Sequence, residues 1–410
     1  MNNKTIAIIV SVVIVVSVLL AAGYVFIFSF RGCINIGQTQ ANNGEILAQY
    51  LNANNQGYTV MRVWGSYYQI GYAHGELLGC YIIEGINEMK NLIGTFMYKQ
   101  VRDAISNSFL TTSNIEDELD GIVAGLAKSC PNSGVDKIDL KVINTAGDWL
   151  YEYACRSHTC WGRYVEEPIK TLSTRRLDYD TFIPTLNHHL LCIYIPNDGS
   201  TKWINLAFPG IVVTMTGVNE YGTLASIHDW SYMEESDLEQ RTMSRLVAIR
   251  YALTYPTSSD ISTHLSSVYN ELQNYEIMTS SYLNYYVPEG YGGIMTCYPW
   301  RTGSDLYELR LPQDNWHHGE AIITTNSDTD GTYTPWDEDF GADSYYNDET
   351  PKTLESHWNL LNSSYPEEGL HRISIAYRNQ DDMTIWVDGR LDGIGRTPRL
   401  EYEWSELFDL

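Results

Sequence analysis

Basic residues are scarce in this 410-residue sequence, which has 26 Lys and Arg against 51 Asp and Glu and a formal net charge of −25 at pH 7. A surface of that sign repels a phosphate backbone, which excludes nucleic acid as a partner. The seven cysteines include no Cys-x-x-Cys pair and no zinc-type spacing with histidine, and a Gly-rich phosphate loop is also lacking. The adjacent histidines at 188–189 and 317–318 face opposite sides of any strand, so neither pair chelates as a unit. We therefore expect neither a metal nor a cofactor.

Apart from one N-terminal segment, the sequence has no apolar run long enough to cross a membrane. Residues 6–30 contain no charged side chain, and at ~1.5 Å per residue a helix of this length crosses a hydrocarbon layer of ~30 Å. A cleaved signal peptide is the alternative, but its apolar core usually has only about 7–15 residues. We expect an uncleaved anchor over residues 1–30 in a single-pass membrane protein. The α-amino group and Lys4 precede the run and Arg31 alone follows it, which slightly favours a cytoplasmic N-terminus and an extracellular main body.

The composition changes twice after this anchor. Residues 31–56 are rich in Asn, Gln and Gly and are interpreted as a spacer. Residues 57–154 begin with a strand pattern at 58–64 and continue with three helical patterns, so this segment is predicted to be mainly helical. From residue 155 strand patterns dominate, near 160–164, 169–177, 190–195, 202–207, 212–217 and 223–228 and again after helices at 239–253 and 259–272. This order, without regular βαβ alternation, predicts an α+β layered architecture rather than a parallel doubly wound sheet.

Cys155 stands at the boundary between the helical and the strand-rich segments. If the bond before it were cut, the freed α-amine would lie beside the thiol. Because such an amine has a pKa near ~8, it can act as a general base at neutral pH. A thiol next to a base is an activated nucleophile. The alternative for any single cysteine is a small buried apolar residue.

Four sequence stretches carry a family resemblance. Cys155-Arg-Ser-His-Thr-Cys-Trp-Gly162, followed by Leu172-Ser-Thr-Arg-Arg-Leu-Asp-Tyr179, resembles the segment that opens the catalytic chain of the penicillin acyltransferase-like (acyl-CoA:6-aminopenicillanic acid acyltransferase) branch of the N-terminal nucleophile (Ntn) hydrolases. The stretch 63–75 looks like the opening of that family's N-terminal chain. Phe208-Pro-Gly210, with the stretch 217–222, looks like its Pro-Gly and Gly-Met-Asn-Glu-x-Gly-Leu elements. The four stretches follow the family order, and weaker similarity continues to about residue 390.

The resemblance implies a four-layer αββα sandwich and a site around Cys155, the nucleophile freed by self-cleavage. In such a site Arg175 stabilises the thiolate and Asp178 holds the α-amine. Asn326 is a candidate donor to the nucleophile region or the oxyanion. A surface ion pair is the alternative for Arg175 and Asp178, and an Asx-turn is the alternative for Asn326.

Three departures from the family pattern bear on the site. Arg156 follows the nucleophile where Ser or Thr is frequent, and Arg176 replaces the Asn of the Gly-Arg-Asn element. His228 and Asp229 occupy the place of an oxyanion-hole Asn. A His228 N–H can donate to an oxyanion, whereas an ionised Asp229 cannot. Cys160, five residues after the nucleophile, is expected on the opposite face of the same strand, in the core.

The sequence therefore predicts a membrane-tethered cysteine Ntn hydrolase. It cleaves or transfers the acyl group of a linear amide or small N-acyl substrate. Fragments 1–154 and 155–410, the latter the catalytic segment, then stay associated without a covalent bond. Two alternatives remain open: a phospholipase B-like acyl-ester hydrolase with the same nucleophile, and a surface binding protein that has the fold without the chemistry.

Overall fold

The computed structural model describes residues 37–52, 56–149, 153–179, 188–229, 242–256, 258–298, 306–314, 319–325, 342–361, 369–391 and 395–409. The predicted anchor at 6–30 lies outside these residues, as does Asn326. Within the described ranges no helix combines the length and the apolar character needed to cross a membrane.

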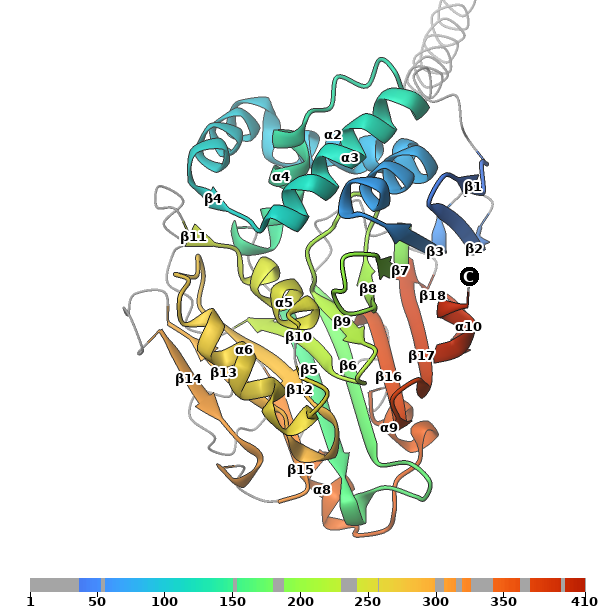
Figure 1. Cartoon of the computed structure of the whole chain (residues 1–410), viewed down its shortest axis with the longest axis vertical. Coiled ribbons are helices and arrows are strands. Elements are labelled where there is room, and N and C mark those ends of the chain that lie inside the picture. Colours follow the sequence, from blue (N-terminus) through green and yellow to red (C-terminus); the bar gives the residue numbers. More distant parts are fainter. Residues whose placement is uncertain are drawn as a thin grey trace, which may run out of the picture.

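Two β-sheets occupy the centre of the molecule (Figure 1). The first has ten strands in the order β1-β2-β3-β7-β8-β9-β10-β12-β13-β14, and the second has the order β15-β5-β6-β16-β17-β18, with β19 also paired to β17. The first contains β1 (Gln40–Ala41), β2 (Gly44–Leu51), β3 (Gly57–Gly65), β7 (His188–Pro196), β8 (Trp203–Ala207), β9 (Thr216–Asn219), β10 (Leu224–Asp229), β12 (Ser281–Tyr286), β13 (Gly293–Cys297) and β14 (Tyr307–Arg310). The second contains β5 (Tyr153–Trp161), β6 (Thr171–Tyr179), β15 (Ala321–Thr325), β16 (Gly369–Asn379), β17 (Asp382–Leu391), β18 (Gly395–Arg396) and β19 (Leu400–Glu403). A separate short ladder joins β4 (Phe109–Leu110) to β11 (Thr242–Met243).

Helices cover the outer faces of both sheets. The N-terminal helices are α2 (Tyr67–Ser108), α3 (Ser113–Ser129) and α4 (Lys137–Trp149); the later ones are α5 (Arg245–Thr254), α6 (His264–Leu272), α8 (Ala342–Asn347), α9 (Leu354–Leu360) and α10 (Trp404–Phe408). In Figure 1, α2, α3 and α4 gather at the top, whereas α5 and α6 lie in front of the first sheet. Residues of α8 and α9 pack on the other face of the second sheet, against Cys160 and Leu172. The order helix, sheet, sheet, helix confirms the predicted α+β layered class.

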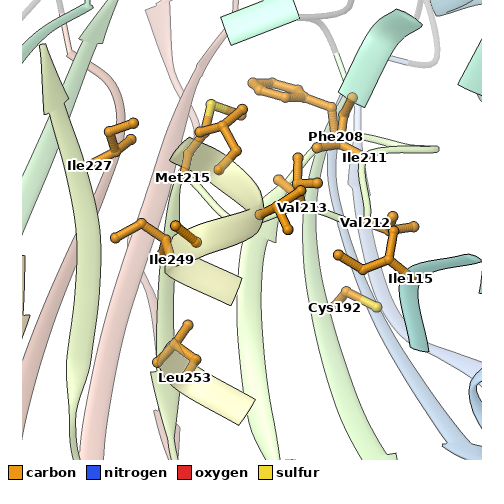
Figure 2. Packing of buried hydrophobic residues seen from close by; sticks show 14 of the residues in the cluster. Ile115, Cys192, Phe208, Ile211, Val212, Val213, Met215, Ile227, Ile249 and Leu253 are labelled. Carbon is orange, nitrogen blue, oxygen red and sulfur yellow. The ribbon is translucent and has the colours of Figure 1, made fainter. Parts of the chain in front are cut away.

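Three apolar clusters hold these layers together. The largest cluster packs helices α2, α3, α4, α5 and α6 on the first sheet. Figure 2 shows part of it, including Ile249 and Leu253 of α5 and Ile227 of β10. A second cluster fills the space between the sheets, with Val60 and Ile193 from one and Ile373 from the other. Because β3, β7 and β8 are covered on both faces, their apolar residues run almost continuously instead of alternating.

Helices α2 and α3 approach each other closely through glycines. A Cβ atom at Gly71 or Gly75 of α2 would collide with carbonyl oxygens of α3, and one at Gly121 or Gly125 would collide with carbonyl oxygens of α2. Both pairs have four-residue spacing, which places each pair on one face of its helix. Gly71 and Gly75 of the 63–75 stretch therefore have a packing role.

The segment 57–149 shares its core with the rest of the chain. Strand β3 pairs in parallel with β7 in the ten-stranded sheet. The Gly210 N–H donates to His74 Nε2 at 3.0 Å, and Asn144 Nδ2 donates to the Gly210 carbonyl oxygen at 2.8 Å. Two of the stretches that carry the family resemblance, 63–75 and 208–210, thus contact each other directly.

The structure differs from the predicted elements at several places, one of them the helix predicted at 239–253, which begins at Arg245. Residues 40–51, assigned by composition to a spacer, form β1 and β2, and the polar composition reflects the exposed positions of these strands at the sheet edge. Strand β5 begins at Tyr153 rather than near residue 160, because its polar residues are buried with partners and give no alternating pattern. Strand β9 begins at Thr216, four residues later than predicted.

Candidate active site

Cys155 is the third residue of β5, and it lies opposite Leu177 of β6. Its side chain is 3% exposed and belongs to the same apolar cluster as Leu177 and Ile227. Cys160 belongs to the cluster on the other face of the sheet, as the strand period predicted. The bond before Cys155 is therefore part of a strand, with Ala154 paired to Asp178.

Arg175 contacts the Cys155 sulfur from the neighbouring strand. Its Nη2 donates to Cys155 Sγ at 3.2 Å and to the Ile227 carbonyl oxygen at 2.6 Å, while Nη1 donates to Thr216 Oγ1 at 2.6 Å. The side chain is fully buried. A guanidinium only donates and stays charged, so its position favours negative charge on the sulfur.

Burial dominates the ionisation of Cys155. It raises the pKa of the thiol to about 12, with Asp229 and Asp178 acting in the same direction and Arg175 and Arg245 acting against it. In the continuous chain the thiol is therefore protonated at neutral pH. Because the thiolate is the nucleophilic form, reaction at this sulfur requires a nearby base.

Asp178 lies one residue beyond Leu177 on β6 and forms a buried ion pair with Arg176. Arg176 also donates to the Leu361 carbonyl oxygen at 3.0 Å. Successive side chains of a strand face opposite ways, so Arg175 lies on the face of β6 that contacts the Cys155 sulfur, whereas Asp178 lies on the other face with Arg176. Arg176, which departs from the family pattern, therefore contacts Asp178, the carboxylate that the resemblance assigns to the α-amine of Cys155.

His228 and Asp229 face opposite sides of β10. His228 Nε2 is 2.6 Å from Ser157 Oγ, on the side of the second sheet. Burial, followed by the charge of Arg175, lowers the pKa of His228 well below its usual value, while a hydrogen bond with the Cys155 backbone opposes the shift. The neutral ring therefore carries one N–H donor beside β5.

Asp229 forms an ion pair with Arg245 at the start of α5, and Arg245 also lies 3.4 Å from Asp148 at the end of α4. All three side chains are buried. An ionised carboxylate held in this way cannot donate to an oxyanion. The structure therefore brings together Cys155, Arg175, Asp178 and His228, whereas Asn326 lies outside the described residues.

Sequence reasoning missed four buried residues of this site: Ser157, Thr216, Arg245 and His371. Ser157 follows Cys155 by two positions, so the strand period could have placed it on the same face. Thr216 directly precedes the 217–222 stretch. No local signal marks Arg245 or His371, because helix α5 and strand β16 bring them to the site from far along the chain.

The histidine pair at 188–189 is split by its strand, as expected. His188 Nε2 lies 3.4 Å from a Glu84 carboxylate oxygen, and His189 Nε2 lies 2.5 Å from the Arg390 carbonyl oxygen. Across the described part of the chain, no group of three His, Cys, Asp or Glu side chains is placed to hold a metal ion.

No protein-family model matches the chain, and a search of curated proteins finds no match. Among solved structures, the chain is similar to a Caenorhabditis elegans ortholog of N-acylethanolamine-hydrolyzing acid amidase, with a TM-score of 0.37 and 13% identity over 54% of this chain and 92% of that one. It is also similar to two variants of the conjugated bile acid hydrolase of Clostridium perfringens, with TM-scores of 0.39, identities of 10% and 9%, and coverage of 62% of this chain and 93% of each of those. At this level of similarity the function has to be argued from the site itself.

Proposed function

We propose that this chain is a cysteine Ntn hydrolase that cuts itself before Cys155 and then cleaves or transfers the acyl group of a linear amide. The observation that carries the proposal is the 3.2 Å contact between Arg175 Nη2 and Cys155 Sγ, near the start of a strand in a two-sheet sandwich. The sequence resemblance to the penicillin acyltransferase-like branch supports the same assignment.

Self-cleavage explains how a deeply buried thiol becomes reactive. The uncut chain holds the thiol at a pKa of about 12, far above neutral. Hydrolysis of the bond before Cys155 frees an α-amine with a pKa near ~8, beside the thiol. That amine takes the thiol proton, Arg175 stabilises the thiolate, and Asp178 holds the resulting ammonium.

The acyl transfer then proceeds in two balanced steps. The Cys155 sulfur bonds to the acyl carbon, the carbon–nitrogen bond breaks, and the departing amine takes the proton from the α-ammonium. Water then attacks the thioester carbon and the α-amine takes a proton from the water. The carbon–sulfur bond breaks, the ammonium returns the proton to the Cys155 sulfur, and the acid leaves. A second amine in place of water gives transfer instead of hydrolysis.

His228 is the proposed side-chain donor to the oxyanion. Its ring is neutral and lies against the nucleophile strand through Ser157. Asp229, the other residue in this place, has no proton to donate and is bound to Arg245. Asn326 remains a proposed second donor on the basis of the resemblance alone.

We propose that residues 6–30 hold the protein on a membrane, with the catalytic segment on the extracellular side. After cleavage the anchor is covalently joined only to residues 1–154. Residues 155–410 then stay on the membrane through the shared sheet and the buried contacts described above. Urea should release the large fragment from washed membranes and leave the small one behind.

Turnover assays test the reaction class. The purified wild-type protein should release acid from N-acyl amino acids, and Cys155→Ala should abolish release, with Cys160→Ala as a matched control that stays active. Turnover of lysophospholipids in place of amides points to an ester hydrolase of the phospholipase B-like kind. Absence of turnover together with absence of acyl labelling at Cys155 points to a binding protein.

A further inference from the structure

The Arg175 guanidinium is itself held by a second polar residue from the opposite sheet. Thr216 on β9 accepts from Arg175 Nη1 at 2.6 Å, and its hydroxyl lies 3.0 Å from His371 Nε2 on β16. A continuous chain of hydrogen bonds therefore runs from His371 through Thr216 and Arg175 to the Cys155 sulfur. It crosses both sheets and uses residues from β5, β6, β9 and β16.

The register of the second sheet places His371 in line with the nucleophile. Cys155 pairs with Leu177, and Leu177 pairs with His371, so the three residues form one row across β5, β6 and β16. Neighbouring strands are about 4.8 Å apart, which puts the His371 backbone roughly 10 Å from that of Cys155. Side chains in one row share a face, and here that face meets the first sheet.

The direction of each hydrogen bond follows from which side-chain groups can donate and which can accept. Arg175 can only donate, so the Thr216 oxygen accepts from it. The single hydroxyl proton of Thr216 remains to be donated. Among the described residues its other hydrogen-bond neighbour is His371 Nε2, so this nitrogen accepts and the His371 ring is neutral.

The surroundings of His371 favour that neutral form. Burial, with the positive charges of Arg175 on β6 and Arg396 on β18 and with His189 on β7, lowers the pKa of His371 well below its usual value. His371 is 1% exposed, and Thr216 is fully buried. The acceptor state at Nε2 is therefore kept throughout the neutral pH range.

We propose that His371 is a positioning residue for the nucleophile. It accepts a hydrogen bond from the Thr216 hydroxyl and thereby orients the Thr216 oxygen toward Arg175. The oriented oxygen in turn holds the guanidinium against the Cys155 sulfur. This role rests on the proposed function of Cys155. Loss of the Thr216 hydroxyl removes one acceptor of the Arg175 guanidinium. Loss of the His371 acceptor leaves the Thr216 hydroxyl free to rotate, so its oxygen is no longer held toward Arg175. In either case the contact of Arg175 with the sulfur loosens.

The test measures alkylation of Cys155 by iodoacetamide as a function of pH, followed by mass spectrometry, alongside kcat and KM for an N-acyl amino acid. Thr216→Val and His371→Leu remove the hydroxyl and the acceptor. We expect both to lower the alkylation rate at pH 7.5 and kcat by about tenfold, the size of one hydrogen bond to a charged group. KM should stay within about twofold, because the chain of hydrogen bonds acts on the nucleophile and not on the substrate.

Conservative variants separate positioning from folding. Thr216→Ser keeps the hydroxyl and His371→Gln keeps an acceptor near Nε2, so both should retain most of the wild-type rate. Thr214→Val is the matched control, since Thr214 is equally buried two residues earlier and its hydroxyl has no hydrogen-bond partner among the described residues. Equal rates for Thr216→Val and Thr214→Val, or for His371→Gln and His371→Leu, overturn the proposal. Alkylation is read without any substrate, so a wild-type protein that cleaves no amide refutes the proposed function and leaves this test intact.

Discussion

Asp229 forms a buried ion pair with Arg245. Asp229 lies two residues after Ile227, whose carbonyl oxygen accepts a hydrogen bond from the Arg175 guanidinium. Asp229, together with His228, stands where the family resemblance places an oxyanion-hole amide. The ion pair ties β10 to the start of α5 and, through Asp148, to the end of α4. Asp229 and Arg245 therefore help to hold the two proposed fragments together, because Arg245 also contacts Asp148 of the N-terminal one. They also contribute charges of opposite sign near Cys155.

Asp229→Asn should make the thiol more acidic. After burial, the charge of Asp229 is a further cause that raises the pKa of Cys155, and Asp148 remains to pair with Arg245. We predict about threefold faster alkylation of Cys155 at pH 8, because a nearby negative charge disfavours the thiolate. Asp382→Asn, an exposed substitution on β17, is the control. An unchanged or slower rate in Asp229→Asn contradicts this account.

Gly75→Ala should destabilise the protein although alanine favours helices. Gain in helix propensity is at most about 1 kcal/mol, whereas the new Cβ collides with the Ile122 carbonyl oxygen of α3. We predict a net loss of roughly 1–3 kcal/mol in the free energy of unfolding, the usual cost of overpacking. Gly319→Ala, which meets nothing within 4 Å, should change the urea midpoint little. Equal midpoints for the two variants exclude close α2–α3 contact.

The buried pair of Glu118 and Arg250 should hold α3 on α5. Arg250 Nη2 lies 2.6 Å from the Glu118 carboxylate, which also accepts from Tyr194 at 3.1 Å. Glu118→Gln leaves a buried guanidinium without its counter-charge, and we predict a loss of about 3–5 kcal/mol in unfolding free energy. The double variant Glu118→Gln, Arg250→Met should recover much of that loss. Additive losses in this cycle would show that the two side chains are not coupled.

Acid should destabilise the folded chain through its buried histidines. Burial lowers the pKa of His74 to about 3, of His158 to about 3 and of His189 to about 4. The unfolded chain binds these protons near pH 6.5 and the folded chain does not, so stability is full above about pH 6.5 and is lost as the pH falls toward 4. Urea midpoints measured from pH 7.5 to 4.5 should fall steadily. His74→Gln should flatten the slope, and a midpoint that rises on acidification contradicts the assignment.

The layered class and the position of Arg175 next to Cys155 could be predicted because their signals are local. The helices at α3 and α4 follow apolar periodicity, and Cys155, Arg175 and Asp178 lie in two adjacent segments with a recognisable order. The strand period also placed Cys160 on the opposite face, which the structure confirms.

The rest of the site depends on contacts between distant parts of the chain. His371 reaches the row of Cys155 only through the pairing of β6 with β16, and Thr216 comes from the other sheet. Arg245 looks like an ordinary helix residue in the sequence, but its neighbours Asp229 and Asp148 precede it by 16 and 97 residues. β1 and β2 were missed because edge strands tolerate the polar residues that also suit a spacer.

The central claim is that Cys155 becomes an N-terminus. The most direct measurement is the intact mass and N-terminal sequence of the purified full-length protein, with Cys155→Ala beside it. The account predicts two fragments in the wild type, the larger one beginning at Cys155, and a single uncut chain in the variant. A wild-type chain that stays whole, or a new N-terminus at any other residue, contradicts it.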